Sequence, residues 1–141
     1  MLAKEVGNTL ARDRLFERTS ELRAQPERDP TLSQYFAGGA IFSGNDFIGA
    51  NMTGADSWVD VKGNGWQVKA NRGSLSPRDG FQVHVEASGW GRGNQITGNQ
   101  GDLGADGEYG VRVDDDARGT VVGCDNHLGG AAKGLANIPC R

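Results

Sequence analysis

Three cationic side chains, Lys62, His84 and Arg112, recur at one position of three strand-like segments of the sequence. Each is the fourth residue of a short segment in which apolar and polar residues alternate. If these segments lie side by side, the three side chains form a column on the outer face, flanked by the carboxylates of Glu86 and Asp114. Stacked like charges repel, so the column is expected to lower the pKa of His84. A cationic strip of this kind can pair with the carboxylates of an acidic sugar.

Three more side chains are predicted to contact a sugar, namely Trp58, Gln82 and Trp90. The two tryptophans are expected to be exposed, with rings that stack on a sugar face, and Gln82 points outward beside the column. A plainer interpretation competes with this one, because charged residues on an outward strand face are usually solvated and bind nothing. Glycan binding, catalysis and a purely structural role therefore all remain as hypotheses.

The elements that would position these residues repeat along the chain. The first sign of the repeat is an asparagine or aspartate at the end of a short segment of mainly apolar or small residues. It occurs at Asn45, Asn71, Asn99 and Asp125. The residues that open the alternating segments recur at a similar interval, close to 26 residues. A glycine- and asparagine-rich repeat of this length, with short strands and no helix between them, favours a parallel β-helix. Its stacked asparagines are expected to form a ladder of side-chain amides.

Composition divides the chain into two parts. Of the 23 glycines, all but Gly7 come after residue 30. Residues 1–30 have helix formers and apolar residues at intervals of four, and Pro26 and Pro30 end this pattern. We therefore predict a helical N-terminal cap or linker over 1–30 and a β-helix over 31–141. Solenoid ends expose core residues, so this helix is expected to cover an open end; if it does not, we expect a homodimer joined there.

Charge and hydropathy narrow the function classes. The net charge of −3 argues against a nucleic-acid partner, which calls for a basic face. No apolar run reaches the roughly 18–20 residues that span a bilayer, which argues against a membrane protein. The first residues lead into a charged segment without the apolar core of a signal peptide, so export would require a leader removed from this chain.

Cys124 and Cys140 are the only two cysteines. One disulfide that closes a short loop near the C-terminus fits this count and would contribute roughly 3 kcal/mol in the chain-entropy model. Two free thiols are an alternative. A zinc site with His127 and His84 is another, although the spacing matches no closed zinc motif.

Four stretches carry a resemblance to a known family: 55–64 (ADSWVDVKGN), 79–84 (DGFQVH), 89–91 (GWG) and 134–140 (GLANIPC). In this order they resemble the last coils of secreted right-handed β-helix proteins, the pectate-lyase-like, polysaccharide-active proteins of actinobacteria and fungi. The resemblance implies a right-handed parallel β-helix of about four coils, an extracellular location and a polysaccharide partner. Such proteins normally have further coils on the N-terminal side, where this chain has the segment predicted to be helical.

The resemblance also implies a chemistry. Enzymes of this kind remove a proton beside a uronate carboxylate, with an arginine or lysine as base and calcium held by carboxylates. In this chain Lys62 or Arg112 would be the base, and Asp56, Asp60 and Asp79 the calcium ligands. Calcium takes six to eight oxygens, so backbone carbonyls and water would have to complete the site. We expect a module that binds acidic, uronate-containing polysaccharide; the alternatives are a calcium-dependent lyase and a truncated β-helix with a structural or oligomerisation role.

Overall fold

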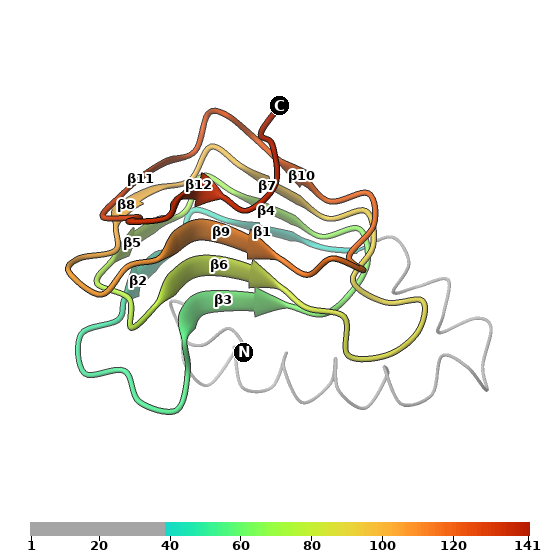
Figure 1. The fold of residues 1–141 in the computed structure, drawn as a ribbon. Helices are drawn as coiled ribbons and strands as arrows, with labels where there is room; N and C mark the ends of the chain where they lie inside the picture. The colour runs from blue at the N-terminus through green and yellow to red at the C-terminus, as the bar shows by residue number, and fades with distance from the viewer. Residues whose placement is uncertain (1–38) are drawn as a thin grey trace.

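The structure is a computed structural model, and it describes residues 39–141. These residues wind through four coils, and each coil contributes one short strand to each of three parallel sheets (Figure 1). Sheet A contains β1 (Ile41–Ser43), β4 (Gln67–Lys69), β7 (Gln95–Thr97) and β10 (Val121–Val122). Sheet B contains β2 (Asp46–Ile48), β5 (Arg72–Ser74), β8 (Gln100–Asp102) and β11 (His127–Gly129). Sheet C contains β3 (Ser57–Val61), β6 (Asp79–Val83), β9 (Tyr109–Val113) and β12 (Gly134–Ala136).

All strand pairs are parallel, and each strand pairs with the equivalent strand of the neighbouring coil. This arrangement confirms the predicted all-β solenoid of about four coils. The predicted helix over 1–30, and the cap or dimer contact that it would provide, lie outside the described residues. Within residues 39–141, no helix has the length and apolar character needed to cross a bilayer.

The core fills the space between the three sheets. Val68 and Ile96, at the centres of β4 and β7, are fully buried, as are Phe81 and Val83 of β6. Because alternate residues of each short strand point inward, one or two apolar side chains per strand suffice to fill each coil. In sheet B the buried Gly73 makes room for the Trp58 ring, because a Cβ at this position would lie only 2.5 Å from its ring atoms.

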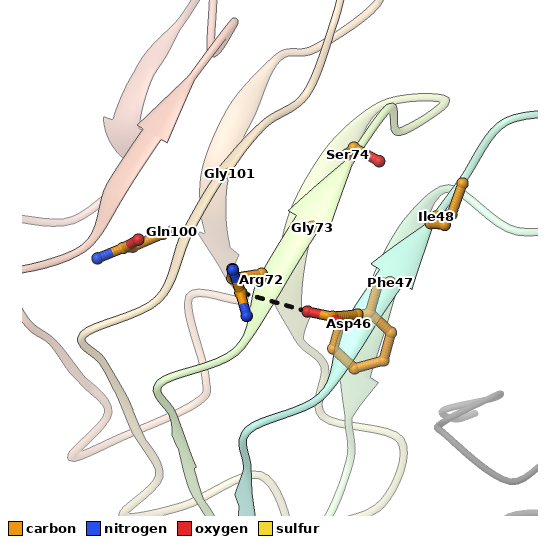
Figure 2. Close-up of a pocket in the computed structure, with 8 residues that line it drawn as sticks. All are labelled: Asp46, Phe47, Ile48, Arg72, Gly73, Ser74, Gln100 and Gly101. Atoms are coloured by element: carbon orange, nitrogen blue, oxygen red, sulfur yellow. Dashed lines mark ion pairs between the residues drawn. The ribbon is translucent and has the colours of Figure 1, made fainter.

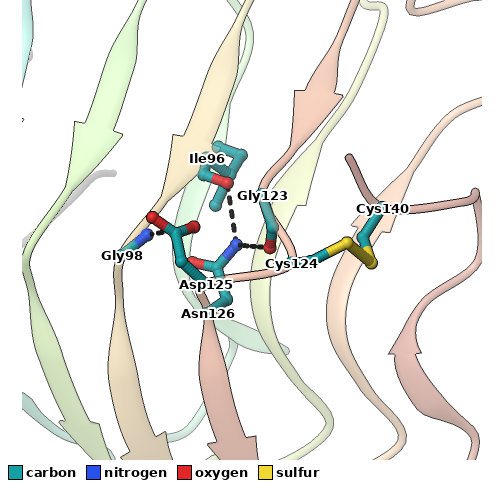
Figure 3. Close-up of a disulfide and its surroundings, with 7 residues drawn as sticks. All are labelled: Ile96, Gly98, Gly123, Cys124, Asp125, Asn126 and Cys140. Carbon is teal, nitrogen blue, oxygen red and sulfur yellow. Dashed lines mark hydrogen bonds between the residues drawn. A yellow bond between two sulfur atoms is a disulfide. The ribbon is translucent and has the colours of Figure 1, made fainter.

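An asparagine ladder stands at the corner between sheets A and B. It consists of Asn45, Asn71, Asn99 and Asn126. Each side-chain oxygen from the second rung on accepts both the backbone N–H and the side-chain amide N–H of the asparagine one coil earlier, at 2.9–3.0 Å. The predicted ladder is confirmed for three coils. In the fourth the prediction of Asp125 is wrong, because Asn126 completes the stack and Asp125 accepts the backbone N–H of Gly98 instead (Figure 3).

The register of sheet C is confirmed in part. Val59 pairs with Phe81, as predicted, but Phe81 pairs with Val111 rather than Tyr109. The cause is a change in turn length. Four residues, 75–78, connect β5 to β6, whereas six residues, 103–108, connect β8 to β9. These two extra residues shift the sequence of β9 by two positions from its predicted alignment with β6.

The C-terminal tail continues the coil onto sheet A. Arg141 exchanges backbone hydrogen bonds with Val122 and Cys124, at 2.9 and 3.0 Å. A disulfide joins Cys124 to Cys140 beside these bonds, as Figure 3 shows. The predicted disulfide is thus confirmed, and the described residues contain no free cysteine. The tail is held on the last coil by one covalent link and by continuation of the sheet.

Candidate functional site

The outer side of sheet C displays different polar residues on successive coils. The register places Gln82 between Asp60 and Arg112. One step further along, His84 and Asp114 continue the ladder, because their backbone N–H groups donate to the carbonyls of Val61 and Val83. We call this surface the sheet C face; its members are Asp60, Lys62, Gln82, His84, Arg112 and Asp114.

The predicted cationic column does not form as expected. Lys62 and His84 are close neighbours, but the shifted register puts Arg112 beside Gln82 and leaves Asp114 beside His84. The reason is the longer turn before β9, which displaces its side chains by two positions. A cation, a titratable ring and a carboxylate therefore follow one another where three cations were predicted.

Asp60 is the centre of the ionic contacts on this face. Its Oδ1 lies 2.7 Å from Nδ1 of His84, and its Oδ2 lies 2.9 Å from Nζ of Lys62. Lys62 also contacts Glu86, with 2.6 Å between Nζ and Oε2. On its other side, Nε2 of His84 lies 3.9 Å from Oδ1 of Asp114. The half-buried ring of His84 is thus placed between two carboxylates.

These contacts shift three pKa values. The hydrogen bond from His84 to the carboxylate of Asp60 raises the pKa of His84 against the opposing effect of burial, so the expected lowering of this pKa is wrong. Burial alone would raise the pKa of Asp60, but hydrogen bonds from His84 and Lys62 outweigh it and lower that pKa. Burial would likewise lower the pKa of Lys62, but its hydrogen bonds to Glu86 and Asp60 raise it. Lys62 therefore keeps its proton at neutral pH and is suited to pairing with anions rather than to removing protons.

A buried polar pair underlies the middle of the sheet C face. Asp79 and Gln82 are 0% and 1% exposed, and the Gln82 amide donates to Oδ2 of Asp79 at 2.8 Å. The backbone N–H of Tyr109 donates to the other Asp79 oxygen at 2.9 Å. Gln82 was expected to be exposed, which is wrong because its side chain folds back onto Asp79. Its Oε1 has no hydrogen-bond partner among the described residues, whereas buried polar atoms normally have one.

Arg112 differs from the other cations on this face. Its side chain is half-buried, next to Gln82 in the strand register, and it forms no ion pair within residues 39–141. Lys62, in contrast, is held by two carboxylates. The guanidinium of Arg112 therefore has its full set of donors available for an anion.

Comparisons with known proteins relate the chain to one solved structure. No protein-family model matches the chain, and no curated protein matches it. The chain is similar to the crystal structure of an alginate lyase from Paenibacillus sp. str. FPU-7. The TM-score is 0.58 and the sequence identity 32%, over 70% of this chain and 36% of that chain. A structural neighbour of this solenoid is thus a polysaccharide lyase. The chain spans about a third of that enzyme's length, and the narrower resemblance to actinobacterial and fungal pectate-lyase-like proteins stays a prediction.

The three aspartates predicted to bind calcium do not form one group. Asp79 is buried with Gln82, and Asp60 is held by Lys62 and His84. Asp56 is exposed, with its Oδ2 3.7 Å from a guanidinium nitrogen of Arg78. Within the part of the chain that the structure describes, no cluster of three or more His, Cys, Asp or Glu side chains is arranged to hold a metal ion.

The two tryptophans expected to stack on a sugar are both buried. Trp58 is 4% exposed, and its indole N–H donates to the carbonyl of Leu75 at 2.9 Å. Period-two alternation placed this ring outside, but Trp58 and Val59 are both in the core, where the ring packs edge-on against Phe81. Trp90 is 9% exposed. The expected exposure of these rings is therefore wrong.

A second ionic group, at the edge of sheet C where three of its strands begin, was not predicted from the sequence. Oε1 of Glu108 lies 3.1 Å from Nε of Arg78 and 3.0 Å from Nζ of Lys133, so it links three coils. Nζ of Lys133 also lies 5.9 Å from the centre of the Tyr109 ring. The signal was present in the sequence, since these three charged residues are 30 and 25 residues apart, close to the repeat interval. Before the register was known, nothing distinguished them from other surface charges.

Proposed function

We propose that this chain binds uronate-containing polysaccharide on the sheet C face. The similarity to an alginate lyase carries the proposal, because alginate is a polymer of uronic acids. The surface supplies suitable chemistry: the unpaired guanidinium of Arg112 can bind a carboxylate through two parallel hydrogen bonds. His84, whose pKa is raised, adds positive charge as the pH falls. The disulfide fits a location outside the reducing cytosol.

Lys62 and His84 have a supporting part in this proposal. Their contacts with Asp60, Glu86 and Asp114 already neutralise much of their charge, so neither is free to pair with a ligand at full strength. Arg112 is therefore the residue that binds a uronate carboxylate. The N–H groups of Lys62 and His84 that are not used within the protein can donate to the same sugar chain and orient it across neighbouring coils. Strands in a sheet are about 4.8 Å apart, so the three side chains are spread over roughly 10 Å.

Affinity electrophoresis tests the proposal. The full chain is run in gels that contain alginate, polygalacturonate or a neutral glucan, and we expect retardation in the first two. Arg112→Ala should weaken retention on the acidic polymers about tenfold, as expected when a charge-assisted hydrogen-bonding group is lost. Arg118→Ala is the matched control, because Arg118 is exposed on the turn after β9 and lies outside the sheet C face. Equal mobility of the wild type in all three gels would reject the proposal.

Elimination is the second candidate function, and the Asp60–His84 contact favours it. A carboxylate that holds Nδ1 of an imidazole at 2.7 Å orients the ring and leaves Nε2 to exchange a proton. In this scheme neutral His84 would remove the proton at C5, beside the uronate carboxylate, while Arg112 stabilises the negative charge that develops. The C4–O glycosidic bond then breaks as the C4=C5 double bond forms, and the leaving oxygen takes up a proton from the protonated His84 or from water. The test is an increase in ultraviolet absorbance from unsaturated product, measured on the same polymers with calcium or with a chelator. If absorbance increases in neither condition, the lyase hypothesis is rejected and binding without turnover stands. If the chain shows no retardation in the gels either, only the structural role stands.

A further inference from the structure

A furrow crosses the outer side of sheet B, on a different sheet of the solenoid from the sheet C face. Its volume is about 420 Å³, within the range of cavities that hold small ligands. Figure 2 shows that the side chains along it come from β2, β5 and β8, which belong to three successive coils. The furrow therefore runs along the stack, across the strands.

The strand register explains why a furrow forms there. Asp46, Arg72 and Gln100 pair with one another and form one outward row, and Ile48 and Ser74 begin a second row two residues further on. The residues between the two rows point into the core, and in β5 and β8 these are the glycines 73 and 101. Two raised rows thus border a floor that is mostly backbone.

The polar side of the furrow combines hydrogen-bond donors and acceptors without net charge. Nε of Arg72 lies 3.3 Å from Oδ1 of Asp46, and the two side chains are 75% and 70% exposed. An ion pair this exposed adds little to stability, so folding does not account for it. Beside it the exposed amide of Gln100 offers one more donor pair and one more acceptor. The opposite row begins with Ile48, an aliphatic side chain that is 77% exposed.

We propose that this furrow is a second glycan site, and that it takes a neutral sugar chain laid along the stack. A sugar ring has hydroxyls at its edge and C–H groups on its faces. The Asp46–Arg72 pair and Gln100 fit the hydroxyls, and Ile48 fits a C–H face. A uronate is disfavoured, because Arg72 is already paired with Asp46 and the furrow therefore has no net positive charge to attract a carboxylate. The chain would then hold an acidic glycan on one sheet and a neutral glycan on another.

Amide-resolved NMR titration of the full chain tests this inference. Cellohexaose and mannohexaose are the neutral probes, and a hexamer of mannuronate is the acidic probe. At least one neutral probe should shift the amide signals of Phe47, Gly73 and Gly101, and the acidic probe should leave them unchanged. The double variant Arg72→Ala/Gln100→Ala should weaken the neutral-probe affinity at least tenfold while its spectrum stays that of a folded chain.

Two controls separate this site from the sheet C face. Arg112→Ala should leave the neutral-probe shifts intact, and Arg92→Ala removes an exposed arginine outside the furrow and should do the same. Failure of the acidic probe to bind anywhere would reject the proposed function and leave the furrow inference standing. The inference is overturned if neither neutral probe shifts the furrow amides, if the double variant binds as well as the wild type, or if only the acidic probe shifts them.

Discussion

At the corner between sheets A and B, four coils stack the same side chain, whereas on the sheet C face each coil contributes a different polar group. In the asparagine ladder every rung repeats one hydrogen-bond pattern, and Asn71, Asn99 and Asn126 are buried with their amides paired. On the sheet C face, Asp60, Gln82 and Arg112 follow one another in one row. There one buried atom, Oε1 of Gln82, lacks a partner among the described residues.

The difference teaches how to separate structural from functional polar residues in a solenoid. Identical side chains stacked at strand spacing satisfy one another, so selection for stability alone explains them. Unlike side chains in a stack leave some donors and acceptors unmatched, and the guanidinium of Arg112 is an example. A ligand can use such groups, whereas the ladder offers it nothing. Substitutions in the ladder should therefore mainly lower stability, and substitutions on the sheet C face should mainly weaken binding.

The largest effect is expected at the centre of the ladder. Asn99→Ala removes the acceptor of both Asn71 N–H groups and the donor to the Val68 carbonyl. Since each buried group left unpaired costs about 1–3 kcal/mol, the free energy of unfolding should fall by about 3–5 kcal/mol in urea titrations. Asn45→Ala, at the end of the ladder, loses only the two hydrogen bonds of its side-chain amide, to Asn71 and to the Ser43 carbonyl, and should cost about 1 kcal/mol. Equal losses at the two positions would contradict a ladder whose rungs depend on both neighbours.

The disulfide tests whether the last rung depends on the C-terminal tail. Cys124 is two residues before Asn126, whose amide donates to the carbonyls of Ile96 and Gly123 (Figure 3). The bond closes a loop of separation 16, so the double variant Cys124→Ser/Cys140→Ser should lose about 3 kcal/mol on the chain-entropy model.

Hydrogen exchange locates that loss. We expect faster exchange at the Asn126 and Arg141 amides and little change at the Asn71 amide, which is two coils away. Uniformly faster exchange in every coil would instead show that the solenoid unfolds as one unit and that the tail does not protect the last rung selectively.

The repeat predicted the ladder well and the sheet C face poorly, and the contrast has a physical origin. The ladder corner has a two-residue connection in the first three coils, so the spacing of asparagines in the sequence carries over directly into space. Strands of sheet C follow turns of variable length, and two extra residues before β9 moved Arg112 away from His84. Trp58 shows a second limit, because alternation does not hold at the start of β3, where Trp58 and Val59 are both in the core.

Gln82 connects the two regions, since it is buried like a ladder residue but incompletely paired. Gln82→Met removes the unpaired oxygen together with the amide that donates to Asp79. Relief of the first partly offsets loss of the second, so we expect the free energy of unfolding to fall by only about 1–2 kcal/mol. Calorimetry of Gln82→Met and Asn99→Ala compares their losses in free energy of unfolding directly. A loss as large as that of Asn99→Ala would place Gln82 with the structural residues and remove the distinction between the two stacks.

The smallest effect concerns the pH dependence of the Asp60–His84 pair. His84 has a raised pKa, so its contribution to stability is complete below its unfolded value near 6.5 and is lost as the pH rises through the folded value. Asp60 has a lowered pKa, so its contribution is present above 3.8 and is lost as the pH falls through the folded value. The advantage of the wild type over His84→Gln should therefore be largest between about pH 4 and 6.5. Because both side chains are partly exposed, it should stay under about 1 kcal/mol. In an Asp60→Asn background the same comparison should lose most of its pH dependence, and an undiminished profile there would assign the shift to Asp114 instead.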